Sequence, residues 1–368
     1  MKVIVLASYT KSLLNFRAPL IHEMQARGCD VLAVGAESEA EWGSRFAANG
    51  IRYRSIPLKR NGLNPFEDLR AMKALKQLFL EEKPDKLFCS QAKAVVYGIP
   101  AARATGVSGV YALISGLGSI FHGSGLKNQL IQFILRQQYK FALAKADTVF
   151  FQNEDDRGIF LKGHIVPKEK TLLIHGSGVD IHRFAPTPFP ETLTFIIVAR
   201  ILRDKGVSEY MEAARRLKSR YPQCRFLLVG PYDTNPSSLG PDDVMPYVNE
   251  GSIEYLGEME NVLAALADSS VFVLPSYHEG TPMSTLEAMA CGRPIVTTDA
   301  PGCRETVRDN ANGFLVPVKD IDNLALAMGK FIHDPSLCTT MGAESRKLAE
   351  NVFASEHVNE AILSVMGI

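Results

Sequence analysis

The stretch 271–292, VFVLPSYHEGTPMSTLEAMACG, constrains the fold more than any other part of this sequence. The short apolar run from Val271 to Leu274 is rich in β-forming residues, ends at a proline and predicts a buried strand. A polar loop with Gly and Pro follows, and then a helix that we expect to begin at Ser284 or Thr285 and to stop at Gly292. Strand, loop and helix in this order are typical of a parallel α/β sheet, in which ligands bind at the carboxyl ends of the strands.

The residues of this loop indicate what such a ligand carries. Backbone N–H groups and the positive end of the following helix favour an anion such as phosphate. Glu279 lies in the loop and Glu287 about two helical turns later. Two carboxylates at one site suit neutral hydroxyl groups, such as those of a sugar and a ribose.

Composition excludes several classes of protein. Lys plus Arg and Asp plus Glu number 40 each, so no net charge favours nucleic acid. The 46% of hydrophobic residues fits large cores in a chain long enough for two domains. The N-terminal apolar run is too short for a signal peptide, and because no run of 18 uncharged apolar residues occurs we expect no membrane span. The cysteines are scattered without a CxxC pair, which predicts a reducing compartment without disulfides or a zinc site: Cys29, Cys89, Cys224, Cys291, Cys303 and Cys338.

Strand and helix patterns alternate twice along the chain. The first series of predicted strands covers 2–7, 30–35, 51–58, 86–90, 110–114, 148–152 and 171–174, and the second covers 193–199, 225–230, 253–256, 271–274, 294–298 and 313–316. Three prolines in RFAPTPFPE, 183–191, mark a linker between them. The expected domains are therefore 1–183, a hinge linker at 184–192, and 193–350, followed by a C-terminal helix at 351–368 that packs back toward the first domain.

At this point the sequence resembles the retaining glycosyltransferases of family 4, which have the GT-B fold. The resemblance rests on the motif 271–296 with its two glutamates and on VARILRDKGV, 198–207, and landmarks of the family extend over nearly the whole chain. FRAP at 16–19, LNPF at 63–66 and GLGS at 116–119 are most similar to bacterial enzymes that add N-acetylhexosamine, often N-acetylgalactosamine, to undecaprenyl-diphosphate glycans. The resemblance implies an α/β protein with two Rossmann-like domains that face a central cleft.

The resemblance also implies a site for a UDP-sugar in the second domain. Arg200 and Lys205 hold the diphosphate, where charge grows as the glycosidic bond breaks, and the flat guanidinium and the compact ammonium together suit that group. Glu279 contacts the donor sugar and Glu287 accepts hydrogen bonds from the ribose. Arg200, Lys205 and Glu279 are thus the expected catalytic residues. Further donor contacts are expected from Gly230, Glu258, Met259, Gly280, Thr281, Pro282 and Met283.

The first domain is expected to bind the acceptor, a saccharide linked to polyprenyl diphosphate. The residues proposed for this task follow strands or lie near strand ends: Ser8, Tyr9, Thr10, Arg17, Lys93, Ser115 and Gly116. Many relatives carry a His after the strand at 110–114, where this chain has Ser-Gly-Leu-Gly; His122 is a possible substitute, although an exposed loop His is the simpler interpretation. A basic amphipathic helix at 126–145 either packs with a solvated side or lies on an anionic membrane; its cations are Lys127, Arg136, Lys140 and Lys145.

No cofactor or metal is expected. The single Asp-x-Asp triplet, 320–322, opens a predicted helix, so we interpret Asp320 as an N-terminal cap. The eight His residues show no ligand spacing. Retention in the resembled family proceeds without a clear protein nucleophile; the departing diphosphate is thought to take the acceptor proton.

The sequence therefore predicts a metal-independent hexosyltransferase of surface-glycan assembly, such as O-antigen, capsule or glycoprotein glycan. It would lie in the cytoplasm, peripherally on the inner face of the cytoplasmic membrane. Two alternatives stay open: a UDP-N-acetylglucosamine 2-epimerase of the same fold, and a sugar-nucleotide-binding protein without turnover. A dehydrogenase is disfavoured because residues 7–12, after the first strand, lack the GxGxxG fingerprint.

Overall fold

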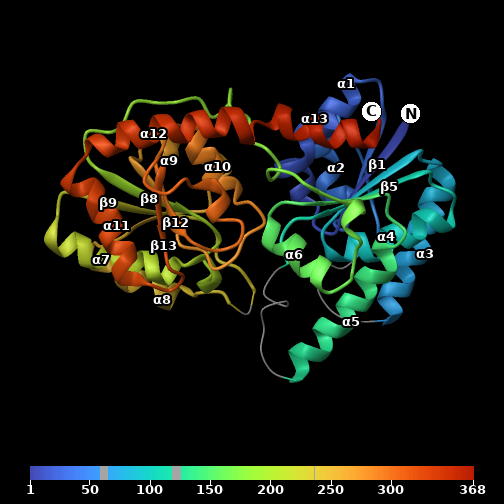
Figure 1. Ribbon diagram of the computed structural model, residues 1–368, viewed down its shortest axis with the longest axis horizontal. Helices are drawn as coiled ribbons and strands as arrows, with labels where there is room; N and C mark the ends of the chain where they lie inside the picture. Colours follow the sequence, from blue (N-terminus) through green and yellow to red (C-terminus); the bar gives the residue numbers. More distant parts are fainter. Residues whose placement is uncertain (59–64, 118–125, 236) are drawn as a thin grey trace. The chain divides into compact units, whose positions relative to one another are not determined.

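A computed structural model describes residues 1–58, 65–117, 126–235 and 237–368. The chain forms two compact units, each built on its own parallel sheet (Figure 1). Unit 1 contains Met1–Ser177 and Val358–Ile368, and unit 2 contains Gly178–His357.

Unit 1 has a seven-stranded sheet in the order β3-β2-β1-β4-β5-β6-β7, and the paired strands run parallel. The strands are β1 (Lys2–Ala7), β2 (Asp30–Gly35), β3 (Arg52–Ser55), β4 (Lys86–Ser90), β5 (Gly109–Ile114), β6 (Thr148–Phe151) and β7 (Thr171–Leu173). Central strands of this kind are buried on both faces, which is why they read as unbroken apolar runs instead of alternating ones.

Helices cover both faces of this sheet. They are α1 (Ala18–Ala26), α2 (Glu39–Ala48), α3 (Pro65–Glu82), α4 (Ala92–Ala104), α5 (Leu126–Leu143) and α6 (Glu154–Lys162), with a π-helical turn at Leu13–Arg17 and a 3-10 turn at Lys168–Lys170. One core joins α3, α4, α5 and α6 to alternate strand residues such as Ile4 and Leu6, and a second core joins α1 and α2 to Val3 and Val5. The period of two along β1 thus divides its side chains between the two layers.

The C-terminal helix α13 (Ser355–Met366) belongs largely to unit 1. Val358, Ile362 and Met366 are buried in the core that contains α1. Arg27 anchors the chain end, because it donates to Glu360 at 2.5 Å and to the backbone oxygen of Ile368 at 3.0 Å. The predicted C-terminal helix at 351–368 is α13 itself, which follows α12 (Ser336–Leu348) and a π-helical turn at Ala349–Phe353.

Unit 2 has a six-stranded parallel sheet in the order β10-β9-β8-β11-β12-β13. The strands are β8 (Thr194–Val198), β9 (Arg225–Val229), β10 (Glu254–Gly257), β11 (Val271–Leu274), β12 (Ile295–Thr298) and β13 (Gly313–Val316). The helices are α7 (Val207–Arg220), α8 (Pro241–Asn249), α9 (Leu263–Ala267), α10 (Met283–Ala290), α11 (Ile321–His333) and α12, with 3-10 turns at Arg203–Lys205 and Arg304–Thr306.

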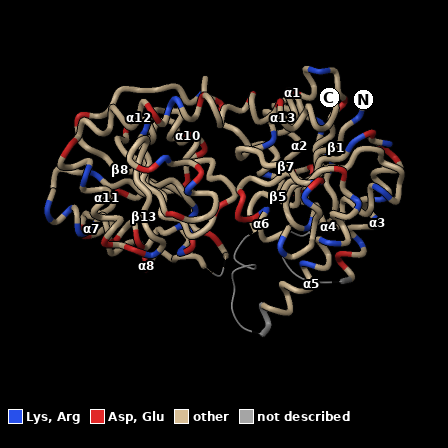
Figure 2. Tube along the Cα trace, viewed as in Figure 1, with Lys and Arg blue, Asp and Glu red and all other residues tan. Residues whose placement is uncertain are grey.

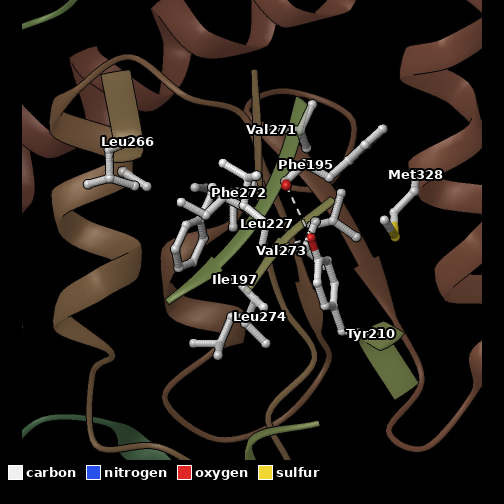
Figure 3. Close-up of a cluster of buried hydrophobic side chains, with 14 of the residues drawn as sticks. Phe195, Ile197, Tyr210, Leu227, Leu266, Val271, Phe272, Val273, Leu274 and Met328 are labelled. Atoms are coloured by element: carbon white, nitrogen blue, oxygen red, sulfur yellow. Dashed lines mark hydrogen bonds between the residues drawn. The ribbon is translucent and has the colours of Figure 1, made fainter. Parts of the chain in front are cut away.

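The core of unit 2 surrounds β8 and β11. In Figure 3 the ring of Phe272 lies on the side of Leu266 from α9, whereas Tyr210 from α7 and Met328 from α11 lie on the other side of the strands. The hydroxyl of fully buried Tyr210 donates to the backbone oxygens of Phe195 and Leu227, both at 3.1 Å. Burial raises the pKa of this phenol well above its usual value, so it stays a donor.

The proline-rich segment 184–192 is part of unit 2, and the boundary between the units lies at Ser177–Gly178. This differs from the predicted hinge at 184–192. Phe184 is buried in the unit 2 core, and the guanidinium of Arg293 lies 4.7 Å from the ring centroid of Phe189 and donates to the backbone oxygen of Thr187 at 2.9 Å. Two aromatic side chains therefore fix a segment whose prolines predicted a free linker.

In the part of the chain that the structure describes, no helix combines the length and the apolar character needed to cross a membrane. The six cysteines are buried and free. Asp320 caps α11, as predicted, because its carboxylate accepts from the backbone N–H of Asn323 at 2.9 Å.

Candidate functional site

The strand order of unit 2 reverses between β8 and β11. From β8 the chain continues to β9 and β10 on one side, whereas β11 is followed by β12 and β13 on the other. At such a switch point the loops after two adjacent strands diverge and leave a crevice at the carboxyl edge of the sheet. The residues expected to bind the donor follow these two strands: Arg200 and Lys205 come after β8, and Glu279 and Glu287 come after β11.

Lys205 and Glu279 form an ion pair across this switch point, although 74 positions separate them in the sequence. Their side chains keep 20% and 12% of their exposure, so the pair is shielded but reachable from solvent. Gly206 allows this approach: its φ is +70°, and a Cβ there would lie 2.1 Å from the backbone oxygen of Pro275. The turn that carries Lys205 thus packs directly against the start of the loop that carries Glu279.

Further hydrogen bonds hold the two loops together. The backbone oxygen of Asp204 accepts from the N–H of Tyr277 at 2.9 Å and from the hydroxyl of Ser276 at 3.1 Å. The N–H of Glu279 donates to Pro301, which follows β12, at 2.9 Å. Three strand-end loops therefore fix the backbone at Glu279 before any ligand binds, as a preorganised site requires.

The loop then enters α10, whose first helical residue is Met283. Its predicted start at Ser284 or Thr285 was late by one or two residues. The first N–H groups of a helix have no partner within it and carry the positive end of the dipole, so this terminus favours an anion. Gly280 and Thr281 are buried beside it.

Arg200 reaches the same edge from the end of β8. Its Nη1 donates to Oδ2 of Asp233, which follows β9, at 2.6 Å. Its side chain is 39% exposed, so part of the guanidinium fork faces solvent. Sequence analysis missed Asp233, because only the adjacency of β8 and β9 brings its loop to Arg200.

Glu287 lies on α10 and is half-buried. Burial raises the pKa of this carboxyl to about 7, and the nearby charge of Arg183 opposes the rise. A carboxylate that has lost water and has little compensating charge gains from hydroxyl donors that arrive with a ligand. Sequence analysis gave Arg183 no role in the site, because this residue begins the proline-rich stretch 183–191 that was interpreted as a linker.

Tyr277 and Glu209 form a second connection that sequence analysis missed. The Tyr277 hydroxyl donates to Oε1 of Glu209, on the first turn of α7, at 2.6 Å. Burial, reinforced by Glu209, raises the pKa of the phenol. The ammonium of Lys319 lies 4.9 Å from the centroid of the Tyr277 ring. The side chain two positions before Glu279 is thus fixed from two sides.

The other expected donor residues line the same carboxyl edge. Gly230 directly follows β9, and its backbone oxygen accepts from the hydroxyl of Tyr255 at 2.9 Å. Glu258 and Met259 follow β10; Glu258 is exposed and Met259 packs partly against the core. Pro282 is the N-cap of α10.

Unit 1 also has a switch point, between β1 and β4. The hydroxyl of Ser8, after β1, donates to Oε1 of Gln91, after β4, at 2.9 Å, and Nε2 of Gln91 donates to the hydroxyl of Ser12 at 2.9 Å. Gln91 has φ +75°, an uncommon conformation for a residue other than glycine. No local pattern predicted a role for Gln91, because its contacts depend on β4 lying beside β1.

Thr10 is fully buried in the same loop. Its N–H donates to Oε2 of Glu37 at 2.9 Å, and its hydroxyl lies 2.9 Å from that of Tyr53. These contacts order the loop after β1. Tyr9, Ser115 and Gly116 are partly exposed at the same edge.

The two cations proposed for the acceptor have different surroundings. Lys93 is paired with Asp68 of α3 at 2.9 Å, and both side chains are mostly buried, so its charge is already compensated. Arg17 is 5% exposed, and burial lowers its pKa to about 10. Among the described residues no carboxylate forms an ion pair with Arg17, which leaves its charge for another anion.

Some predictions fall outside the described residues. They concern His122, Gly118 and Ser119 of GLGS, and Leu63 and Asn64 of LNPF; the side chain of Lys127 is also not described. Within the described residues no group of three or more His, Cys, Asp or Glu side chains is arranged to hold a metal ion. Metal independence stays a prediction.

Comparison with known proteins gives matches over both units. Residues 179–348 match the family described as glycosyl transferases group 1, and residues 16–176 match the glycosyl transferase 4-like domain. The chain is 28% identical over 376 residues to the N,N'-diacetylbacillosaminyl-diphospho-undecaprenol alpha-1,3-N-acetylgalactosaminyltransferase of Campylobacter jejuni, with 97% of each chain covered. It is 25% identical to the UDP-Gal:alpha-D-GlcNAc-diphosphoundecaprenol alpha-1,3-galactosyltransferase of Escherichia coli, over 83% of this chain and 81% of the relative.

A solved structure has the same fold. The crystal structure of Anabaena HepE in complex with UDP superposes with a TM-score of 0.79 at 18% identity and covers 100% of both chains. The predicted fold class, GT-B with two Rossmann-like domains, is confirmed. That the domains face each other across a central cleft stays a prediction.

Proposed function

Because this chain belongs to the glycosyltransferases, with a glycosyl transferase 4-like domain followed by a group 1 domain and with relatives that build polysaccharides and glycans, we propose a specific reaction for it. It moves an N-acetylated hexose, N-acetylgalactosamine or N-acetylglucosamine, from a UDP donor to a saccharide linked to polyprenyl diphosphate. The name of the Campylobacter jejuni relative supports both the sugar and the lipid carrier. The UDP bound to HepE, which shares only the fold, fits a uridine nucleotide donor.

The ion pair between Lys205 and Glu279 at the switch point carries this proposal. A single carboxylate that compensates a lysine next to a helix N-terminus leaves positive potential in the crevice. The donor diphosphate is held there by Lys205, Arg200 and the N–H groups that begin α10. Glu279 then accepts from hydroxyls of the donor sugar, and Glu287 accepts from the ribose hydroxyls.

Transfer proceeds with retention of configuration. The bond between the anomeric carbon and the phosphate oxygen breaks, and the acceptor oxygen bonds to the same face of that carbon. The acceptor proton passes to the departing phosphate oxygen, so no protein base is required. Arg200 and Lys205 stabilise the charge that develops on the diphosphate, a task that a metal ion performs in other transferases.

The acceptor binds to unit 1 at the loops after β1, β4 and β5. Arg17, a buried cation without a carboxylate partner among the described residues, supports an anionic group at this edge. Ser8, Tyr9, Ser115 and Gly116 border the acceptor, whereas Lys93 and Thr10 shape the site through their partners. Because the carrier is a lipid, the enzyme works in the cytoplasm, peripherally on the inner face of the membrane.

A screen of UDP-sugars against a polyprenyl-diphosphate-linked sugar tests the proposal. We expect transfer from a UDP-N-acetylhexosamine, an unchanged rate in EDTA and a product with the anomeric configuration of the donor. Transfer only after a divalent metal is added would refute metal independence, and inversion would refute the proposed course of the reaction. Conversion of UDP-N-acetylglucosamine to its C2 epimer without acceptor would favour the epimerase instead.

A further inference from the structure

Exposed apolar side chains gather on two helices of unit 1 that share one face of its sheet. Leu69 of α3 is 67% exposed, and Leu130, Phe133 and Ile134 of α5 are 60%, 60% and 38% exposed. We call these four residues the apolar rim. Large apolar side chains normally lie inside a soluble protein, and several on neighbouring elements mark an interaction surface.

The topology of unit 1 places the apolar rim at the carboxyl edge of the sheet. Only three residues join the end of α3 to β4, and four join the end of α5 to β6, so both helices end near the amino edge. Each helix has 18 residues and spans about 27 Å, whereas strands of four to six residues span about 13–20 Å. The first turns of α3 and α5 therefore project beyond the carboxyl edge, as Figure 1 shows for α5.

A contact at that edge supports this placement. Asp68, in the first turn of α3, pairs with Lys93, in the first turn of α4, at 2.9 Å. The beginnings of α3 and α4 are thus side by side, one residue from Leu69. The loops after β1, β4 and β5, where we place the acceptor, end at this same edge.

The apolar side of α5 points away from the protein. At 100° per residue, Leu130, Phe133 and Ile134 fall within a 100° arc, and the buried residues Tyr139 and Ala142 lie on the opposite side. The first half of the helix therefore has an outer apolar face in addition to the inner one that packs on the core.

The charges of α5 indicate which kind of partner binds to this apolar face. The helix contains no Asp or Glu between 126 and 143, and its charged residues are Lys127, Arg136 and Lys140. In Figure 2 the projecting part of α5 carries no red segment. A protruding apolar face on a purely cationic helix is the combination that binds anionic bilayers, because apolar side chains enter the acyl boundary while cations meet the headgroups.

We propose that the apolar rim inserts into an anionic lipid bilayer and holds the carboxyl edge of unit 1 against the membrane, where a lipid-linked acceptor is anchored. This inference rests on the proposed function for the identity of the acceptor, but the insertion itself does not depend on transfer. The membrane-binding surface then consists of the cations of α5 together with the apolar rim, whose residues come from both α3 and α5.

Vesicle co-sedimentation without donor or acceptor tests the insertion. The double variant Leu130→Gln with Phe133→Gln should bind phosphatidylglycerol vesicles at least about tenfold more weakly than wild type. The reason is that burying one large apolar side chain in the bilayer strengthens binding by about tenfold. The matched control is Leu80→Gln: Leu80 is also 60% exposed on α3 but lies near its other end, so binding should stay within about twofold of wild type. Equal binding by the double variant and wild type, or no binding by wild type, would overturn the proposal.

A second readout reports on the depth of the rim. Phe133→Trp should shift its emission to the blue on addition of vesicles and be quenched by lipids brominated on the acyl chain, whereas Leu80→Trp should show neither effect. A second copy of the chain could cover the apolar rim instead of a bilayer, and sedimentation without vesicles tests this. If wild type is a dimer and the double variant is a monomer, the proposal is overturned in favour of a second copy. Transfer to a water-soluble acceptor analogue should be unchanged in the double variant. If wild type transfers nothing yet inserts, the proposed function fails and the insertion stands.

Discussion

The ionisation of Glu287 should change the affinity of the protein for UDP by an amount that follows from the pKa of this carboxyl. Burial around α10 raises the pKa of this carboxyl from 4.5 to about 7. At pH 8 about nine-tenths of the protein then carries the carboxylate, and at pH 6 about one-tenth does. Only the ionised form accepts from both ribose hydroxyls. Binding of UDP should therefore weaken about tenfold from pH 8 to pH 6 on account of Glu287, which corresponds to about 1.4 kcal/mol.

Glu287→Gln separates this effect from the titration of UDP itself. The amide keeps the shape of the side chain but does not ionise, so the ratio of the two affinities isolates the carboxylate. By calorimetry we expect the variant to bind UDP about tenfold more weakly at pH 8, where a charged hydrogen bond worth about 1.5 kcal/mol is lost, and nearly equally at pH 6. An affinity ratio that is the same at both pH values would show that ionisation of Glu287 does not contribute to UDP binding.

The same shift predicts a dependence of stability on pH. Because the folded pKa lies above 4.5, the folded protein binds more protons than the unfolded chain between about pH 4.5 and 7, and its free energy of unfolding falls as pH rises through that window. The cost of the buried carboxylate is fully present above pH 7 and amounts to about 3 kcal/mol. Without ligand, Glu287→Gln should raise the melting temperature at pH 8 and leave it nearly unchanged at pH 4.5. A lower melting temperature at pH 8 would contradict this sign.

Three further substitutions examine other parts of the two sites. Lys205→Met should lower kcat by about a hundredfold with a smaller change in donor KM, because it removes a cation from the departing diphosphate; steady-state kinetics with an unchanged kcat would exclude that role. Tyr277→Phe should destabilise the fold by about 1–3 kcal/mol in urea, because Glu209 loses its 2.6 Å hydrogen bond while its Oε2 already has no partner among the described residues; an unchanged midpoint would contradict this. Arg17→Met should raise the KM for the lipid-linked acceptor at least about tenfold without lowering the melting temperature, since a buried unpaired charge is costly. A lower melting temperature with an unchanged acceptor KM would assign Arg17 to packing.

Sequence analysis predicted the strand, loop and helix at 271–292 because several local signals agree there. The buried strand, the breaking residues Pro275 and Pro282 and the helix after them are all properties of neighbouring residues. The strand at Val271–Leu274 was predicted with the bounds that the structure has, for the same reason. Local pattern therefore suffices where an element is strongly amphipathic or sharply bounded.

The missed features depend on the arrangement of elements in space. Asp233 meets Arg200 only because β8 and β9 are neighbours, and Gln91 bridges Ser8 and Ser12 only because β4 lies beside β1. Strand order is not a property of local sequence. The helix at Glu39–Ala48 was missed because Gly43 lies inside it and its single fully buried residue is Phe46.

The hinge prediction shows how a correct local inference can mislead. Prolines exclude regular structure from 184–192, and the segment is indeed neither helix nor strand. Phe184 and Phe189 were the contrary signal, because apolar rings cost free energy in an exposed linker. Arg293, which is fully buried, also holds this segment in place, because it donates hydrogen bonds to the backbone oxygen and the hydroxyl of Thr187. No spacing in the sequence predicts these contacts.

A crystal structure of the protein with bound UDP would identify the groups that hold the donor. We expect the diphosphate within hydrogen-bond distance of Arg200 and Lys205, and the ribose hydroxyls within hydrogen-bond distance of the Glu287 carboxylate. UDP bound away from the carboxyl ends of β8 and β11, or a diphosphate held without either cation, would contradict this expectation.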